Sequence, residues 1–106
     1  MRKGSVWWMD FDPTAGSEIQ KTRPAVIVSN EIANRHLSRV VVVPLTGNIK
    51  TIYPGNALVT VNDKRNRAMA DQIRAVDKLR LRDKLCQLSA ADLAAVEDAI
   101  RLHLAL

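Results

Sequence analysis

The sequence predicts a small α+β domain in which five or six β-strands precede a single C-terminal helix. Short runs of β-branched and aromatic residues recur along most of the chain, separated by proline, glycine and asparagine. Beyond residue 88, apolar side chains instead recur at the three- and four-residue spacing of an amphipathic helix. With 106 residues, the chain has the length of one domain, which we expect to span residues 1–106.

Three strands are predicted in the first half of the chain. Residues 4–10 begin with a glycine and contain two tryptophans, which favours a strand, whereas residues 12–21 are typical of a turn-rich loop. Residues 24–29 form the second strand, since proline is tolerated at a strand's first position. A short helical turn at 30–34 then leads to residues 40–45, a nearly continuous β-branched run that indicates a buried central strand.

Shorter strands are predicted in the second half. Residues 57–61 form one strand, and the charged residues 62–66 that follow it form a turn. Residues 68–73 and 75–76 form two further strands, with a break near Arg74.

The C-terminal helix has a recognisable start. Ser89 and Asp92 form a pair similar to a capping box, and Leu88 with Leu93 can form the hydrophobic staple that fixes the entering chain. One face of the helix is apolar and is expected to cover the sheet. The side chains on that face are those of Leu93, Val96, Ile100 and Leu104.

The chain carries a moderate positive charge. Sixteen lysines and arginines against eleven acidic residues give a net charge of +5. A positive charge that is spread along the chain fits a partner that bears phosphates. It is equally compatible with solubility alone, so charge by itself leaves both interpretations open.

Cysteine content and hydropathy indicate a cytoplasmic protein. Cys86 is the only cysteine, so no internal disulfide can form, as is typical of a reducing compartment. It lies in the apolar run 85–88 and is expected to be a small buried side chain rather than a nucleophile. No run approaches the roughly 18 apolar residues of a membrane span, so no membrane partner is expected.

Groups that can grip a phosphate gather around the second predicted strand. Ser17 and Glu18 lie in the turn-rich loop, Arg23 directly precedes the strand, and Thr46 follows the central strand. Guanidinium donors match phosphate oxygens, and hydroxyls can donate to them. Taken singly, each residue also has an ordinary structural role in a loop, an ion pair or a strand end. No cluster has the spacing of a metal site, so neither metal nor cofactor is expected.

Four short motifs resemble, in their order, those of the MazF/PemK family of toxin endoribonucleases. They are Asp-Phe-Asp-Pro-Thr at residues 10–14, Gly-Ser-Glu at 16–18, Arg-Pro-Ala at 23–25 and Pro-Leu-Thr at 44–46. No single motif is specific, but the ordered set covers nearly the whole chain. The resemblance implies a small curled antiparallel sheet, an SH3-like barrel of the CcdB/MazF type with a C-terminal helix, and a homodimer.

The resemblance also implies the catalytic residues. It places the family's catalytic arginine on Arg23, its threonine on Thr46 and its serine on Ser17. RNA supplies its own nucleophile, the 2′-hydroxyl, so the protein must align this group and stabilise the charge on phosphorus. Because arginine is almost never deprotonated, Glu18 is the nearest candidate for a general base. Glu18 could equally serve only to orient Arg23, and both roles stay open.

Other basic and polar residues are candidates for binding RNA. Basic residues in the predicted turns could contact the RNA backbone or form only a solvated rim. They are Lys50, Lys64, Arg65 and Arg67. Gln72 and Arg74 match a family segment near the substrate groove and are candidates for binding rather than catalysis.

Two adjacent tryptophans, Trp7 and Trp8, lie on the first predicted strand. Successive side chains of a strand face opposite sides, so we expect one of them in the core. The other is then available to cover a dimer or partner groove.

As a function, the resemblance implies a toxin that cleaves single-stranded RNA, in particular messenger RNA, at a short sequence. It further implies metal-independent cleavage to 2′,3′-cyclic phosphate and 5′-hydroxyl ends, and inhibition by a cognate antitoxin with a disordered acidic tail. One alternative is a CcdB-like gyrase poison, but residues 101–106 lack the C-terminal tryptophan and glycine of such toxins. The other alternative is a non-catalytic RNA-binding module, which the aromatic content of 4% disfavours.

Overall fold

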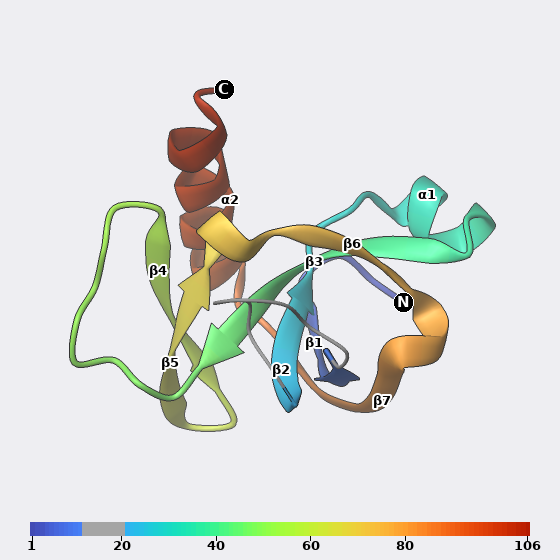
Figure 1. Ribbon diagram of the computed structural model, residues 1–106, viewed down its shortest axis with the longest axis horizontal. Coiled ribbons are helices and arrows are strands. Elements are labelled where there is room, and N and C mark those ends of the chain that lie inside the picture. Colours follow the sequence, from blue (N-terminus) through green and yellow to red (C-terminus); the bar gives the residue numbers. More distant parts are fainter. Residues whose placement is uncertain (12–20) are drawn as a thin grey trace.

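The computed structural model describes residues 1–11 and 21–106. In these parts of the chain, strands are the most frequent element and a long helix follows the last of them (Figure 1). The strands are β1 (Ser5–Asp10), β2 (Thr22–Ile27), β3 (Arg39–Thr46), β4 (Asn56–Val61), β5 (Lys64–Met69), β6 (Arg74–Asp77) and β7 (Leu81–Gln87). The helices are α1 (Glu31–His36), α2 (Ala90–Leu104) and the short 3-10 turns η1 (Ala70–Gln72) and η2 (Lys78–Arg80).

The strands form one curled antiparallel sheet around β3. Its order is β4-β5-β3-β2-β1-β7. Strand β6 also pairs with β3, along the first half of the edge whose last residues pair with β5. The long strand β3 therefore has neighbours on both edges, as expected for the buried β-branched run. The predicted fold, a small curled sheet with a C-terminal helix, is confirmed (Figure 1).

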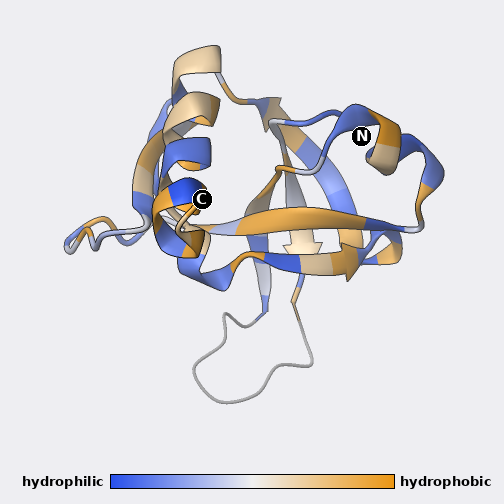
Figure 2. Ribbon diagram, turned by 90° about the horizontal axis from the view of Figure 1, so that it is seen from above, coloured by the Kyte–Doolittle hydropathy of each residue, from blue (hydrophilic) through white to orange (hydrophobic). Residues whose placement is uncertain are grey.

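Both faces of the sheet bury apolar side chains, because successive residues of each strand point to opposite faces. One core contains Val26, Val43 and Leu45, and α2 packs on it through Val96 and Ala99. The residues of the other core are Met9, Phe11, Ala25, Ile27, Val40, Val42 and Val76. In Figure 2, apolar and polar positions alternate around α2, as its place over the first core requires.

The hairpin of β4 and β5 differs from the prediction for residues 62–66. Only Asn62 and Asp63 form the turn, with φ angles of 47° and 68°, and β5 already begins at Lys64. Two successive residues of positive φ make a tight hairpin turn that suits the twist of the strands. The predicted turn was therefore too long, and the charged side chains that follow Asp63 belong to a strand.

The structure differs from the prediction at two further places in this half of the chain. The predicted strand at 68–73 ends at Met69, because η1 turns the chain before β6 begins at Arg74. Strand β7 was not predicted, although it pairs along β1 from Gln87 to Leu81 with two irregularities in register.

The start of α2 agrees with the prediction, whereas its last turn does not. The Asp92 backbone N–H donates to Ser89 Oγ at 3.1 Å, and Leu88 just before the cap is buried. Leu104 was expected to cover the sheet but is 47% exposed, because the last turn of α2 extends beyond the core. No helix in the described ranges is long and apolar enough to cross a membrane.

Replacing Ser89 by alanine should lower the free energy of unfolding by about 1 kcal/mol, since it removes the N-terminal cap of α2. Urea denaturation followed by circular dichroism measures this change. Ser38→Ala, at an exposed serine outside any helix, is the matched control and should leave the stability unchanged. Equal losses in the two variants would contradict the capping role.

Candidate active site

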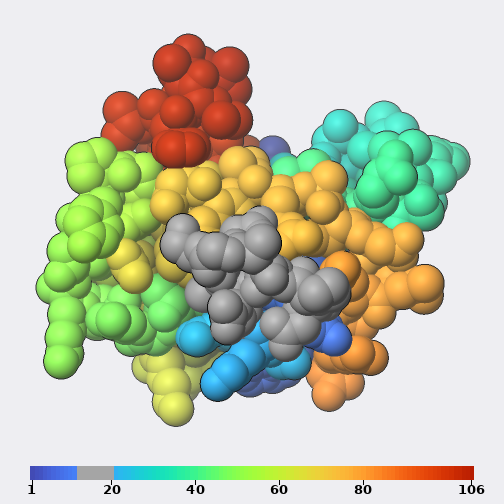
Figure 3. All heavy atoms as spheres, in the orientation of Figure 1, coloured from blue at the N-terminus to red at the C-terminus, as the bar shows by residue number. Residues whose placement is uncertain are grey.

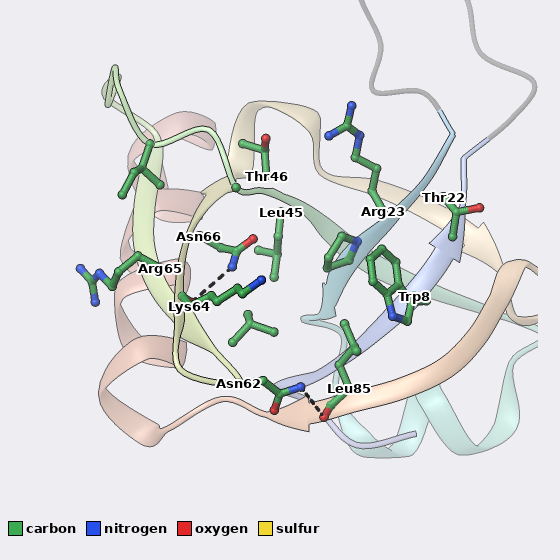
Figure 4. A pocket seen from close by; sticks show the side chains of 14 residues that line it. Trp8, Thr22, Arg23, Leu45, Thr46, Asn62, Lys64, Arg65, Asn66 and Leu85 are labelled. Atoms are coloured by element: carbon green, nitrogen blue, oxygen red, sulfur yellow. Dashed lines mark hydrogen bonds between the residues drawn. The ribbon is translucent and has the colours of Figure 1, made fainter.

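The register of β2 and β3 brings Arg23 and Thr46 together. Ala25 lies opposite Pro44, and Val26 opposite Val43. The pairing ends at Ala25 and Pro44, and Arg23 and Thr46 each lie two residues beyond it, so strand alternation places both side chains on the same face of the sheet. Figure 4 shows them at one edge of a pocket, each at the end of its strand.

Thr46 is held tightly at this edge. It is only 7% exposed, it is the strand partner of Arg67 on β5, and its Oγ1 accepts a hydrogen bond from the Asn48 backbone N–H at 3.2 Å. Because the hydroxyl oxygen is the acceptor in that bond, its proton remains free to be donated to a ligand. The geometry suits a fixed hydrogen-bond donor.

Arg23 is held by the backbone on either side of it. It lies within β2, is partly buried and precedes Pro24, a position that favours the extended conformation seen here. Its guanidinium presents planar paired donors that match phosphate oxygens. The other two predicted catalytic residues, Ser17 and Glu18, lie outside the described residues.

An open pocket of about 770 Å³ adjoins this pair. Its lining includes Arg23 and Thr46 at one edge, and the described residues around it contribute no carboxylate. The apolar lining residues are Trp8, Pro24, Leu45, Ile49, Val61 and Leu85, and the polar and basic ones opposite the pair are Asn62, Lys64, Arg65 and Asn66. Three of these residues are cations and none is acidic, so the surroundings of the pocket are positively charged.

The pocket lies on one face of these strands, and the side chains of Arg23 and Thr46, called the reactive pair below after their proposed role, lie on the other. Leu45 points to the face opposite to Thr46, and Pro24 to the face opposite to Arg23, since each pair is adjacent in a strand. Trp8 is the strand partner of Pro24 and shares its face. Arg23 and Thr46 therefore border the pocket from outside, rather than filling it.

The structure brings some of the predicted RNA-binding residues together and separates others. Lys64 and Arg65 line the pocket with Arg23, whereas Lys50 is exposed in the connection between β3 and β4 and does not line it. Gln72 and Arg74 lie outside the pocket as well. RNA contact by these five residues stays a prediction.

Arg74 nevertheless lies on the face that carries the reactive pair. It is the strand partner of Val42, which is four residues before Thr46 in β3 and therefore points to the same face. The Arg74 guanidinium lies 5.8 Å from the centroid of the Phe11 ring. Gln72, the last residue of η1, donates from Nε2 to Sδ of Met69 at the end of β5, at 3.7 Å. Figure 3 shows the segment that carries these two residues, in yellow and orange, at the surface of this side of the molecule.

Arg67 lies beside Thr46, a position that its sequence context did not indicate. It is the strand partner of Thr46, its Nη1 donates to Asn56 Oδ1 at 3.2 Å, and its guanidinium lies 5.8 Å from the Tyr53 ring centroid. Its Nε is buried without a hydrogen-bond partner in the described structure. The sequence placed Arg67 with other basic residues in a turn, and only the pairing of β3 with β5 sets it beside Thr46.

Burial raises the pKa of the Cys86 thiol above its usual value, although the Asn62 backbone N–H and the charge of Lys84 oppose this shift. The neutral thiol is therefore favoured at neutral pH. Cys86 was predicted to be buried but is only partly buried, because β7 is paired on one edge by β1. Among the residues that the structure describes, no three His, Cys, Asp or Glu side chains gather as metal ligands would.

Comparison with known proteins identifies the family. The profile of the PemK-like, MazF-like toxins of type II toxin–antitoxin systems matches residues 2–104. The chain belongs to this family. Endoribonuclease MazF9 of Mycobacterium tuberculosis is 40% identical over 113 residues, which cover 98% of this chain and 96% of that protein. Endoribonuclease MazF of Staphylococcus saprophyticus is 36% identical over 111 residues, covering 100% and 92%.

Solved structures agree with this assignment. Crystalline MazF from Deinococcus radiodurans superposes with a TM-score of 0.88 at 26% identity, covering 100% of this chain and 97% of that chain. A mycobacterial endoribonuclease in complex with its cognate antitoxin gives 0.83 at 29% identity, covering 100% and 96%. The predicted family and fold are confirmed, and the predicted enzyme class, endoribonuclease, is that of the curated MazF relatives.

Proposed function

We propose that this MazF-family chain is a toxin that cleaves single-stranded RNA, in particular messenger RNA, at a short specific sequence. The observation that carries the proposal is the alignment of Arg23 and Thr46 on one sheet face, beside a pocket with three cations and no carboxylate among its described residues. A phosphodiester placed between the two side chains would meet both guanidinium and hydroxyl donors.

In the proposed reaction, the 2′-oxygen of RNA attacks the adjacent phosphorus and the 5′-oxygen of the next nucleotide leaves. Negative charge increases on the non-bridging oxygens in the transition state. Arg23 donates to these oxygens, and the Thr46 hydroxyl adds a donor whose direction is already fixed by its bond from Asn48. The products are a 2′,3′-cyclic phosphate and a 5′-hydroxyl end, and the step needs no metal ion.

Two protons must move in this step, one from the 2′-hydroxyl and one to the leaving 5′-oxygen. Glu18 is proposed either as the base that takes the first proton or as the group that orients Arg23. Ser17 is proposed as a third donor to the phosphate. Both residues lie outside the described ranges, so their roles rest on the family motif alone.

The remaining phosphates of the RNA would follow the basic side chains near the pair. Lys64 and Arg65 lie at the pocket, and Arg67 and Arg74 lie on the sheet face that carries Thr46. We place Lys50 and Gln72 farther along the same strand of RNA. Contacts of this kind fix position and supply affinity that weakens with salt.

A homodimer and a cognate antitoxin are the proposed protein partners, and the cytoplasm is the proposed location. A domain of this size buries a modest core. Leu102 in the last turn of α2 and Leu106 just after the helix are 65% and 84% exposed, which favours a second subunit. One similar endoribonuclease was solved with its cognate antitoxin. An acidic antitoxin tail would complement the basic residues around the pocket.

Cleavage should persist in EDTA, since the proposed chemistry uses only the RNA hydroxyl and side chains of the protein. The measurement is incubation of the purified chain with a long RNA in chelator, followed by mapping of the new 5′ ends. Cuts at a recurring short sequence with 5′-hydroxyl ends are expected. Activity that disappears in EDTA and returns with magnesium would contradict the mechanism, and intact RNA would favour the gyrase-poison or RNA-binding alternatives.

Arg23→Ala should abolish cleavage, whereas Thr46→Ala should slow it by about 10²–10³-fold, the usual effect of losing one transition-state donor. Single-turnover rates on a short RNA substrate measure both effects. Thr46→Ser keeps the hydroxyl and should retain most activity. Arg101→Ala removes the same charge at an exposed helical site and should cleave normally. Folded Arg23 and Thr46 variants with undiminished rates would remove both residues from the mechanism.

RNA and an acidic antitoxin peptide should compete for the chain, because both are negatively charged and would bind the same basic residues around the pocket. The peptide is titrated against an RNA whose reactive 2′-hydroxyl is replaced by hydrogen, and light scattering on the same samples reports whether two chains associate. Peptide binding should be rapid and should weaken with salt. Simultaneous binding with unchanged affinities would show that inhibition is indirect.

A further inference from the structure

The pocket of about 770 Å³ has features that the proposed phosphate chemistry does not use. Its lining is largely apolar, and it lies on the sheet face opposite to the Arg23 and Thr46 side chains. A phosphate would gain little from such a surface, because apolar groups offer no donors to its oxygens. The pocket therefore suits a flatter and less polar group than the phosphodiester itself.

Trp8 gives this pocket an aromatic surface in a fixed position. It is 38% exposed, whereas its strand neighbour Met9 is fully buried, and β1 is paired on both edges by β2 and β7. A large aromatic ring left partly open on a rigid strand can stack on a nucleobase at little entropic cost. Trp7 has a different role, since it faces the other core and its Nε1 donates to Ser5 Oγ at 2.9 Å.

Asn66 gives the pocket a buried amide that can recognise a base edge. It is 8% exposed, and its Nδ2 donates to the Lys64 carbonyl at 3.3 Å, which leaves Oδ1 as an acceptor. Carboxamides form paired hydrogen bonds with the edges of unstacked bases. In Figure 4, Asn66 and Lys64 approach the pocket from β5, across from Trp8 on β1.

Among the described residues, space is open beside Gly47, which lies between Thr46 and the pocket. Gly47 follows Thr46 and lines the pocket, and in the described structure a Cβ at Gly47 would meet no atom within 4 Å other than those of its chain neighbours. A nucleotide whose phosphate lies at Thr46 can therefore direct its base past Gly47. Lys64 lies on the same face of β5 as Asn66, and no described lining residue is acidic, so this side of the pocket favours the anionic chain of the RNA.

We propose that this pocket receives the nucleobase of a nucleotide next to the scissile phosphate, stacked on Trp8 and recognised at its edge by Asn66. This inference rests on the proposed function, which places that phosphate at Arg23 and Thr46. The pocket then contributes to the cleavage sequence, and Trp8 and Asn66 act as specificity determinants rather than catalytic residues.

The adjacent tryptophans provide a matched pair of reporters. In Trp7→Phe, fluorescence comes from Trp8 alone, and in Trp8→Phe it comes from Trp7 alone. Both variants are titrated with the cleavage-site RNA whose reactive 2′-hydroxyl is replaced by hydrogen. Binding should quench the emission of Trp8 strongly and that of Trp7 little, since only Trp8 borders the pocket.

Kinetics on the same substrate separates base binding from chemistry. Trp8→Ala should raise KM roughly tenfold to a hundredfold, the range expected for losing one base-stacking contact, while kcat changes little. Trp8→Phe should recover part of the affinity. Removing the base next to the cleaved bond should weaken binding to the wild type but not to Trp8→Ala. Asn66→Ala should weaken the base preference at that position, so that mapped cleavage sites contain several different bases there.

The outcomes distinguish this inference from the proposed function. Two outcomes would show that the pocket does not bind a base, while the proposed endoribonuclease activity would stand. One is sequence-specific cleavage with a wild-type KM by folded Trp8→Ala, and the other is an unchanged Trp8 emission when RNA binds. Quenching of Trp8 by RNA without cleavage would uphold the pocket and overturn the enzyme. Quenching by an acidic peptide but not by RNA would assign the pocket to a protein segment and overturn the proposal.

Discussion

The pleat of strand β3 is the constraint on which the rest of this structure depends. Its successive residues Val42 and Val43 enter different cores, and the strand pairs with β2 on one edge and with β6 and β5 on the other. Each fully buried valine or leucine here contributes about 1.5–3 kcal/mol. A shift of one residue in register would expose both sets of apolar side chains at once, so the register is strongly fixed.

That fixed register also positions the groups proposed for catalysis. Arg23 lies near the start of β2 and Thr46 at the end of β3, each two residues from the paired and buried part of the sheet. Donors that are oriented before the substrate arrives stabilise a transition state without having to reorganise. The partner strand β5 adds Arg67 beside Thr46, so the positive charge at this edge comes from a tertiary pairing as well as from the local motif.

The sequence allowed the central strands to be predicted, because β-branched runs are local signals, and its ordered motifs singled out Arg23 and Thr46, whose role in catalysis stays a prediction. Strand β7 escaped prediction since Leu81–Gln87 is half charged and contains no β-branched residue, and it forms only because β1 offers an edge to pair with. The basic residues after Asp63 were read as a turn for the same reason. The face of each tryptophan, and the place of Arg67 beside Thr46, depend on which strands pair, and no local pattern contains that information.

The two faces of these strands suggest how cleavage and sequence recognition can be separated. Phosphate chemistry at Arg23 and Thr46 needs only groups that every nucleotide has, whereas the pocket around Trp8 could contact a single base. Because that pocket lies behind the reactive pair, a base can enter it only when it has left its stack. A base held in a double helix would have to unpair and unstack first, at a cost of a few kcal/mol. The arrangement would thus favour single-stranded RNA without any contact dedicated to rejecting duplexes.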